Sequence, residues 1–307
     1  MKKESSQLYD LAIIGAGIVG LAAGVYAGRM NLKTIIFGNE KGGTLAKTHI
    51  VENYPGFISL SGPELMKKIE DHAKEYIKDI KMNEVKEITK ENNNFLIKTR
   101  KEEFLSRSLL FATGSKWREL NVPGEKEFRN KGVHYCASCD GPLYKGKKTA
   151  LVVGGGDSAV KESFLLSEYF DEVHVIARSK FKPEPINADR AKKNKKIKLH
   201  EGVEIKEIKG DQFVNRVILS SPINGKTNFH VDAIFVEIGH IPLSDLAIKL
   251  GVNVNKKGEI IITRNARTNI PGIYAAGDVA DLQFKQAITG VGEAVTAIYS
   301  LNDDLGK

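Results

Sequence analysis

YDLAIIGAGIVG, residues 9–20, joins a short apolar run directly to three glycines at the spacing GxGxxG. The apolar half is typical of a buried parallel strand, and the small apolar residues that come next predict a helix. A strand, a glycine turn and a helix in this order predict a dinucleotide-binding unit. Gly15 makes the tight turn, Gly17 lets the backbone approach a pyrophosphate, and Gly20 lets the helix pack closely on the strand.

The residues after this turn extend the same interpretation. The helix N-terminus offers free N–H groups and a positive dipole end to the pyrophosphate. A second strand, Lys33–Phe37, ends shortly before Glu40, which lies 20 positions after Gly20. An acid at this distance commonly binds the ribose hydroxyls. The alternative is an ordinary tight turn that binds nothing.

A second unit of this kind opens about 139 residues later. Its parts are a strand at 149–153, the turn GGGDSA at 154–159, a helix from about 158 to 169 and a strand at 172–176. The next stretch, ARSKFK at 177–182, contains Arg178, Lys180 and Lys182 and no acid. Basic groups at this point accommodate a 2′-phosphate, so the pattern favours NADP(H) over NAD(H). The alternative is that these are solvated surface charges.

The rest of the chain predicts mostly strands. They are an antiparallel meander over 85–107 and strands at 109–111, 198–200, 203–209, 214–220, 231–238 and 258–263. Ser61 is a candidate N-cap for a helix that reaches about Ile77, and a closing helix is expected over 290–299. An apolar strand at 273–276 ends in Gly277 and Asp278, which directs an acid toward the ligand-binding edge of the sheet.

The only two cysteines, Cys136 and Cys139, are separated by two residues and followed by Asp140. This spacing suits a redox-active dithiol. A zinc site needs about four ligands, and only His134 lies close by, so no metal site is expected. A structural disulfide or inert thiols remain alternatives. Beside two dinucleotide units, a dithiol indicates a flavin that passes electrons from a nicotinamide to a disulfide.

Composition limits the class of protein. The chain has 307 residues, 41% of them hydrophobic and 27% charged, which fits two globular domains. It has no apolar run near the ~18 residues of a membrane span, no apolar N-terminal signal and few cysteines, so a cytoplasmic location is expected. The net charge is +8, with a basic run at 192–198. Because no aromatic residues are interleaved there, a solvated helix end is favoured over a nucleic-acid surface. A field that attracts anionic ligands or an acidic partner is a third interpretation.

Motifs along nearly the whole chain resemble those of one family, the low-molecular-weight thioredoxin reductases. They are GAGIVG at 15–20, EKGGTL at 40–45, VENYPG at 51–56, ATG at 112–114, CASCDG at 136–141, GGGDSA at 154–159, IGH at 238–240, IPGIYAAGD at 270–278 and KQA at 285–287. The resemblance implies an α/β fold with two Rossmann-like dinucleotide-binding domains, each a three-layer arrangement of parallel sheet and β-meander. A discontinuous FAD-binding domain would cover 1–115 and 241–307, and an NAD(P)H-binding domain with the CxxC would cover 116–240.

The resemblance also implies roles for single residues. FAD would be lined by Gly15, Ala16, Gly17, Gly20, Glu40, Gly43, Leu45, Asn53, Ala112, Gly114, Gly277, Asp278, Gln286 and Ala287. NAD(P)H would be lined by Gly154, Gly156, Asp157, Ser158, Ala159, Arg178, Lys182 and Gly239. Cys139 would lie nearest the flavin, Cys136 would attack the thioredoxin disulfide, and Asp140 would protonate the outgoing thiolate. The family forms homodimers and swings its two domains so that nicotinamide and dithiol alternate at the flavin.

Two departures from the family pattern bear on the electron donor and the flavin. NADPH-specific members carry a His-Arg-Arg run and a later Arg, where this chain has Ala177-Arg178-Ser179 and Lys182. Lys is not equivalent to a bidentate Arg, so NADPH, NADH and another donor stay open. Lys285 replaces an Arg of many members.

The electron acceptor is also left open by the sequence. It is thioredoxin, a glutaredoxin-like protein, a peroxiredoxin system or a small disulfide. A flavin-binding sensor without turnover is a further alternative, against which both cysteines and Asp140 argue. Ferredoxin–NADP reductases of similar architecture lack the cysteine pair and are excluded.

Overall fold

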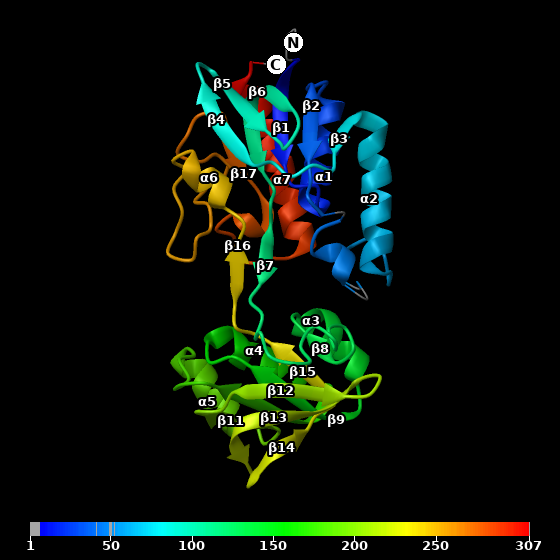
Figure 1. Cartoon of the computed structure of the whole chain (residues 1–307), viewed down its shortest axis with the longest axis vertical. Helices are drawn as coiled ribbons and strands as arrows, with labels where there is room; N and C mark the ends of the chain where they lie inside the picture. The colour runs from blue at the N-terminus through cyan, green and yellow to red at the C-terminus, as the bar shows by residue number, and fades with distance from the viewer. Residues whose placement is uncertain (1–6, 41, 49–50, 52, 307) are drawn as a thin grey trace. The chain divides into compact units, whose positions relative to one another are not determined.

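The computed structural model describes residues 7–40, 42–48, 51 and 53–306, and the chain forms two compact units (Figure 1). Unit 1 consists of the residues up to Lys116 together with those from Ile241 onward, and unit 2 is Trp117–His240. The chain passes between the units in two short strands, β7 (Ser115–Trp117) and β16 (His240–Pro242), which pair with each other. Unit 2 is therefore an insertion in unit 1.

Unit 1 is built on a sheet with the strand order β3-β2-β1-β6-β5-β4, in which β17 also pairs with β6. The bounds are β1 (Leu8–Ile14), β2 (Thr34–Phe37), β3 (Asp79–Lys81), β4 (Glu87–Glu91), β5 (Asn94–Lys98), β6 (Glu103–Phe111) and β17 (Ile273–Ala275). β1, β2, β3, β6 and β17 pair in parallel, whereas β4, β5 and β6 form the predicted antiparallel meander. The separate strand predicted at 109–111 is wrong, because those residues continue β6.

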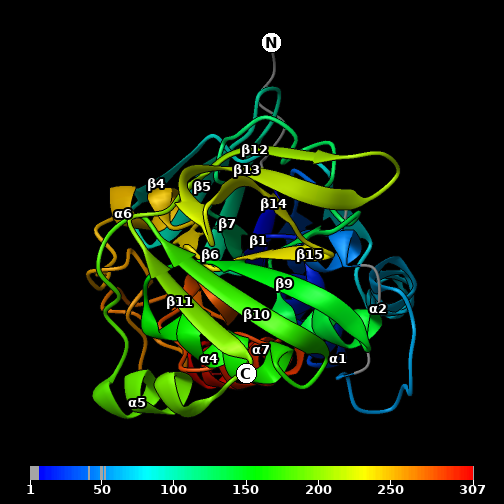
Figure 2. The ribbon, with the colours of Figure 1, turned by 90° about the horizontal axis from the view of Figure 1, so that it is seen from below.

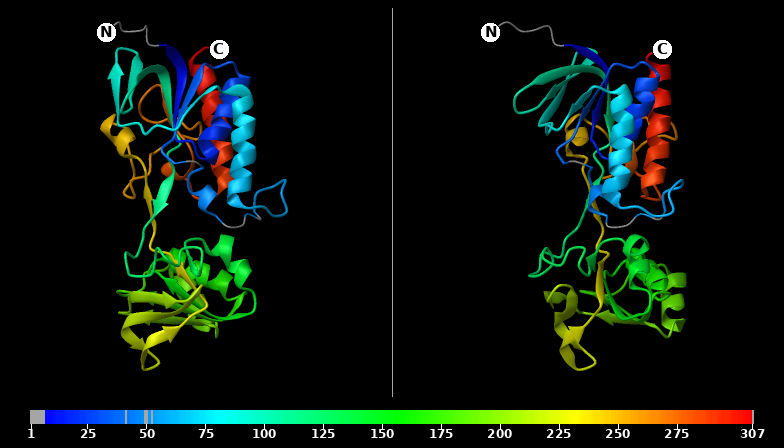
Figure 3. Two further views of the ribbon diagram at one scale, coloured as in Figure 1. Left: turned by 45° about the vertical axis from the view of Figure 1, so that its right-hand side comes forward. Right: turned by 90° about the vertical axis from the view of Figure 1, so that its right-hand side faces the viewer.

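Three helices of unit 1 lie side by side along the sheet: α1 (Ile18–Arg29), α2 (Gly62–Tyr76) and α7 (Ala287–Asp304) (Figure 3). The predicted N-cap of α2 is confirmed, since Ser61 Oγ accepts from Glu64 N at 3.3 Å and Glu64 Oε2 accepts from Ser61 N at 2.7 Å. This reciprocal capping box satisfies two backbone donors at the helix start. Shorter elements are η1 (Leu45–Lys47), α6 (Asp245–Lys249) and η3 (Gly277–Val279).

Unit 2 has three layers (Figure 2). A parallel sheet has the order β11-β10-β9-β15-β8, with β8 (Val133–His134), β9 (Lys147–Val153), β10 (Phe170–Ala177), β11 (Ile197–Glu201) and β15 (Ala233–Val236). On one side lie α4 (Asp157–Leu166) and α5 (Pro185–Lys193), and on the other an antiparallel sheet of β12 (Ile205–Gly210), β13 (Val214–Ile223) and β14 (Lys226–His230). The sheet is covered on both faces because successive side chains of a strand point to opposite sides. In β9, Ala150 and Val152 pack in the core with α4, while Leu151 and Val153 pack with β12 and β13.

Several sequence predictions need correction. Residues 258–263 form no strand; Ile260 makes only isolated bridges to Val254 and Ala280. The closing helix is longer than predicted, and α5 and β14 were not predicted. The basic run is divided: its first two lysines end α5, whereas Lys196 Nζ donates to two backbone carbonyls at 2.9 Å. The interpretation of the basic run as a solvated helix end therefore holds only for Lys192 and Lys193.

Candidate functional site

The first glycine turn lies between β1 and α1, and two of its three glycines are in close contact with backbone atoms. Gly15 has φ +125°, and a Cβ on it would lie 2.1 Å from Ala112 O. A Cβ on Gly20 would lie 1.8 Å from Gly15 O. A Cβ on Gly17, by contrast, would meet no heavy atom within 4 Å. Two glycines thus let β1, β6 and α1 touch, and the third leaves open space against the backbone.

Unit 2 repeats this arrangement between β9 and α4. A Cβ on Gly154 would lie 2.3 Å from Glu237 O and 2.8 Å from Ala159 Cβ, while a Cβ on Gly156 would meet nothing within 4 Å. Both helices begin at these open glycines, since Gly17 and Gly156 are the N-cap residues of α1 and α4. Neither N-cap has a side-chain hydrogen bond. Open backbone at the start of a long helix fits a pyrophosphate, so both turns fit a dinucleotide.

The segments that line the first turn lie close together. A Cβ on Gly43 would lie 3.6 Å from Gly17 Cα, which places the loop before η1 over the turn. Leu45 begins η1, and Ala16 is buried beside Gly38. Glu40 lies three residues after β2 and is exposed. Lys41 and Glu52 of the EKGGTL and VENYPG motifs lie outside the described residues, as does the N-terminal segment 1–6.

The C-terminal segment brings further predicted residues to this region. Asp278 Oδ2 accepts from Ser115 Oγ at 3.3 Å. Gln286 is the N-cap of α7, whose first residue is Ala287, and its Oε1 accepts from Asn53 Nδ2 at 3.1 Å. Gly114, with φ +69°, accepts from Leu243 N at 3.0 Å. Residues more than 200 positions apart in the chain therefore share one part of unit 1.

Two charged side chains, Lys285 and Glu293, hydrogen-bond to the backbone of residues 277–280. Lys285 Nζ donates to the carbonyls of Asp278 and Ala280 at 2.9 and 2.8 Å and forms an ion pair with Glu259 at 3.1 Å. Glu293 Oε2 accepts from Gly277 N at 2.7 Å, and burial raises the pKa of Glu293 to about 7. Sequence reasoning noted Lys285 but missed Glu293. Its position one helical turn after Gly290, within small apolar residues, is the signal that was available.

In unit 2, Cys136 and Cys139 form a disulfide, with S–S at 2.08 Å and Cα atoms 5.3 Å apart. Cys136 is the N-cap of the short helix α3 (Ala137–Asp140), and both cysteines are partly exposed. Asp140 is 8% exposed and ends this helix. The two cysteines predicted as a pair are therefore joined by a disulfide, and buried Asp140 directly follows Cys139 in the chain.

Near Asp140 lie buried His134 and half-buried Tyr144, which the sequence did not identify as its neighbours. His134 Nδ1 lies 3.3 Å from Asp140 Oδ2, at ion-pair distance, but within the described part of the chain it has no partner in hydrogen-bond geometry. His134 Nε2 lies 2.8 Å from the hydroxyl of Tyr144, in the 3₁₀ segment η2 (Gly141–Tyr144). Burial, then the charge of Asp140, raises the pKa of Tyr144 to about 12. His134 lies between Asp140 and Tyr144, and no group of three or more His, Cys, Asp or Glu side chains placed to hold a metal ion occurs among the described residues.

The nicotinamide-side predictions gather around the second turn. Lys182 N donates to Gly155 O at 2.8 Å, so the basic stretch after β10 is tied to the turn. Arg178 follows β10 directly and is exposed, as is Ser158 in the first turn of α4. Gly239, with φ +97°, accepts from Arg118 N at 3.0 Å.

Asp157 differs from these residues, because its carboxylate is used within the protein. Its Oδ1 accepts from Glu184 N at 2.9 Å and from Asn187 Nδ2 at 2.8 Å, and its Oδ2 pairs with Lys161 at 2.6 Å. The bond from Lys161 lowers the pKa of Asp157. This side chain joins α4 to the start of α5.

Unit 2 also contains a pair of half-buried acids, Glu237 and Glu162, that sequence reasoning missed. Glu237 follows β15, and burial together with the charge of Glu162 on α4 raises the pKa of Glu237 to about 8. Burial also raises the pKa of Glu162, whose Oε2 has no hydrogen-bond partner within the described ranges. The pair therefore holds a proton at neutral pH.

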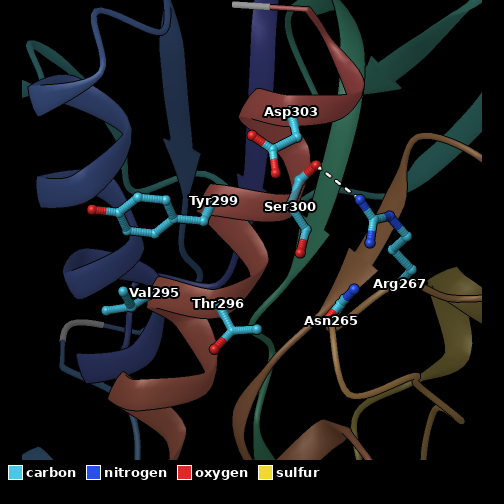
Figure 4. Close-up of a pocket in the computed structure, with 7 residues that line it drawn as sticks. All are labelled: Asn265, Arg267, Val295, Thr296, Tyr299, Ser300 and Asp303. Atoms are coloured by element: carbon cyan, nitrogen blue, oxygen red, sulfur yellow. Dashed lines mark hydrogen bonds between the residues drawn. The ribbon is translucent and has the colours of Figure 1, made fainter.

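A hollow of about 370 Å³ on unit 1 lies apart from these features (Figure 4). Residues of α7 and Asn265 and Arg267 line it, and none of them is a predicted site residue. Arg267 donates to Ser300 O at 3.4 Å and pairs with Asp304 at 2.8 Å. The hollow is a shallow polar depression beside an ion pair, so it does not represent the dinucleotide site.

Two open dinucleotide turns and a disulfide in one chain define a nucleotide-dependent disulfide oxidoreductase, and the chain belongs to the pyridine nucleotide-disulphide oxidoreductase family, whose model matches residues 9–297. Membership implies a flavin and a nicotinamide nucleotide as cofactors. Its curated relatives include the thioredoxin reductase of Bacillus subtilis (strain 168), 37% identical over 96% of this chain and 94% of that protein. The thioredoxin reductase of Mycoplasma genitalium is 36% identical over 97% of this chain and 96% of that protein. The crystal structure of thioredoxin reductase from Streptococcus pyogenes MGAS5005 superposes with a TM-score of 0.89 at 34% identity, covering 98% and 99%.

The protein is thus an oxidoreductase, and the predicted family and two-domain α/β fold are confirmed. No helix of the described residues is long and apolar enough to cross a membrane.

Proposed function

We propose that the protein is a thioredoxin reductase that passes electrons from NAD(P)H through FAD and the Cys136–Cys139 pair to the disulfide of thioredoxin. The observation that supports this most directly is the disulfide of α3, which lies in the same inserted unit as the second dinucleotide turn. The similarity to thioredoxin reductases over nearly the full chain supports thioredoxin as the acceptor.

Unit 1 is the FAD-binding domain and unit 2 the NAD(P)H-binding domain in this proposal. The FAD pyrophosphate would meet the backbone at Gly17, with Gly43, Asp278 and Gln286 around the same nucleotide. The nicotinamide nucleotide would meet the backbone at Gly156. When bound, FAD accepts a hydride from NAD(P)H and delivers two electrons to a disulfide.

Once the Cys136–Cys139 disulfide is reduced, the chain's own thiols carry the exchange. The Cys136 thiolate attacks one sulfur of the thioredoxin disulfide, a mixed disulfide forms, and one thioredoxin thiolate leaves. The Cys139 thiolate then attacks the Cys136 sulfur, which releases the second thioredoxin thiol and restores the internal disulfide. Both steps proceed with no change in the number of electrons held by the sulfurs.

The departing thiolate needs a proton, and Asp140 is the group proposed to give it. Its burial and its position one residue after Cys139 support this role. His134, 3.3 Å from Asp140, and Tyr144, bonded to His134, form the chain through which this proton would be replaced.

We propose NADPH as the preferred donor, with NADH as a weaker one. The stretch after β10 presents Arg178 and Lys182 to solvent, and neither forms an ion pair among the described residues. Unpaired cations at this point suit a 2′-phosphate. Because a single Arg is present, discrimination against NADH should be weaker than with a full bidentate set.

The assembly and location follow the family expectation. We propose a homodimer that works in the cytoplasm with thioredoxin as its protein partner, and no role for nucleic acid or membrane. A sedimentation-equilibrium measurement tests the dimer, which a single species at the 33.8 kDa chain mass would contradict.

The function is tested by separating flavin reduction from disulfide exchange. The purified protein should be yellow, lose its flavin absorbance anaerobically with NADPH, and reduce thioredoxin. Cys136→Ser should keep the bleaching and reduce thioredoxin turnover to background. Bleaching by dithionite alone would refute the donor assignment, and turnover by Cys136→Ser would refute the exchange role.

The acceptor is tested with the same protein. Thioredoxin, a glutaredoxin-like protein, a peroxiredoxin and a small aromatic disulfide should be compared by kcat/KM. Thioredoxin should give the highest value, and a higher value for another acceptor would replace it in this proposal.

A further inference from the structure

The proposed FAD site of unit 1 has a half-buried acid, Glu293, hydrogen-bonded to its backbone. Glu293 lies on α7, and its Oε2 accepts a hydrogen bond from Gly277 N at 2.7 Å. Gly277 begins the η3 turn that carries Asp278, a residue of the proposed FAD site. Glu293 therefore holds the backbone of a turn that faces the cofactor, without belonging to that turn.

The packing around this bond leaves the turn little freedom. A Cβ on Gly277 would lie 2.9 Å from the Val19 side chain, and a Cβ on Gly290 would lie 3.2 Å from Gly277 Cα. The start of α1, the η3 turn and α7 thus touch at residues without side chains. Glu293 lies three positions after Gly290, on the same side of α7. Its carboxylate adds a side-chain hydrogen bond to a junction built from close backbone contacts.

The charges that face Glu293 make it sensitive to protonation near neutral pH. Burial is the main reason why the pKa of Glu293 rises to about 7, and the negative charges of Asp281 and Asp278 act in the same direction. The bond from Gly277 N and the positive charge of Lys285 act against it. Lys285 is itself paired with Glu259, which limits its effect. A small fall in pH therefore converts a charge-assisted hydrogen bond into a neutral one.

We propose that Glu293 is a positioning residue for FAD: as a carboxylate it fixes the Gly277–Asp278 turn in the conformation that receives the cofactor. This inference rests on the proposed FAD-binding role of unit 1. The ionised carboxylate makes the stronger bond to the N–H group, so it is the form that favours FAD. FAD affinity should accordingly fall as the pH drops through about 7.

The test measures FAD binding to apoprotein of the full chain by quenching of FAD fluorescence, at pH values of about 8 and about 5.5. At the higher pH, Glu293→Ala should weaken FAD binding by about 10- to 100-fold, because the Gly277 N–H loses its acceptor. Glu293→Gln keeps an acceptor without charge and should weaken it about 3- to 10-fold at the higher pH and not at the lower. Asp303→Asn, an exposed acid on the same helix, is the control and should match the wild type.

The outcomes separate the possible roles. If Glu293→Gln lowers the melting temperature of the apoprotein but leaves the FAD dissociation constant unchanged at both pH values, Glu293 is only structural and the proposal is overturned. An equal difference between Glu293→Gln and the wild type at both pH values would also overturn it. Wild-type protein that binds no FAD would refute the flavin assignment of unit 1 itself, a result distinct from FAD binding that does not depend on Glu293.

Discussion

Glu237→Gln should stabilise unit 2 at alkaline pH, contrary to the usual effect of changing a buried polar residue. Glu237 follows β15, and its pKa is raised to about 8, first by burial and then by the charge of Glu162. Glutamine has nearly the same shape as the protonated acid and carries no charge at any pH. The substitution therefore removes the cost of ionising Glu237 and leaves the packing in place.

The sign and size follow from proton linkage. A carboxyl group whose folded pKa lies above its unfolded value contributes stability that is complete below the unfolded value, near 4.5, and is lost as the pH rises through the folded value, about 8. The slope between these limits is at most about 1.4 kcal/mol per pH unit. The wild type should thus lose about 2 kcal/mol relative to Glu237→Gln between pH values of about 6 and about 8. Relaxation around the buried charge makes this an upper estimate.

The fluorescence of Trp117 reports on unit 2, because Trp117 is the chain's single tryptophan and belongs to that unit. Its ring stacks on that of Tyr135, with 5.4 Å between the ring centroids. Urea unfolding followed by its fluorescence should show equal stability of wild type and Glu237→Gln below pH about 4.5. The advantage of the variant should grow between there and pH about 8 and level off above it. Glu207→Gln, which removes a half-exposed acid paired with Lys209, is the matched control. A constant difference across the pH range, or a variant less stable than the wild type at alkaline pH, would show that Glu237 does not hold a proton.

Three further predictions concern the proposed chemistry. Gly17→Val should fold, as judged by circular dichroism, but bind FAD at least about tenfold more weakly. Gly156→Val should stay yellow and resist bleaching by NADPH. An unfolded Gly17→Val would contradict the open space at that turn. Replacing Arg178 and Lys182 by Ser should lower kcat/KM for NADPH by about 10- to 100-fold and leave that for NADH, and an equal loss for both donors would argue against a 2′-phosphate site. Asp140→Asn should slow thioredoxin turnover by about 100-fold with unchanged bleaching by NADPH, and an unchanged turnover would remove its role as acid.

The features that the sequence predicted well are those encoded by neighbouring residues. The turn at 15–20 was predicted because its glycine spacing is encoded within one strand–turn–helix unit, and the close approach of Gly20 to Gly15 O agrees with this. The close approach of Gly15 is to Ala112 O, an atom of a distant residue that the motif itself does not name. The N-cap of α2 was predicted for the same reason, since Ser61 and Glu64 satisfy each other's backbone groups three positions apart. The cysteine pair likewise needs only its own spacing.

The features that were missed depend on distant partners. Residues 258–263 contain three consecutive isoleucines, which suit a strand, but among the described residues Ile260 makes only isolated bridges, to Val254 and Ala280. Glu293 resembles an exposed helix residue until α7 packs on Gly277, 16 positions earlier. His134 was considered as a zinc ligand, and its true neighbours, Asp140 and Tyr144, are set by the return of the chain through α3 and η2. A single sequence shows the pattern of neighbouring residues, but it does not show which distant residues come into contact in the fold.

The two glycine turns also differ in a way that motif matching treats as equivalent. In unit 1 the third position must be glycine, because a Cβ on Gly20 would lie 1.8 Å from Gly15 O, a backbone atom. In unit 2 the third position is Ala159, and its methyl group instead occupies the space that a Cβ on Gly154 would need. Helix α1 therefore lies against the backbone of its turn, whereas α4 is held off by one methyl group. The tighter turn belongs to the site proposed for FAD, which must keep its cofactor through every turnover, and the looser one to the site proposed for NAD(P)H, which must release its nucleotide each time.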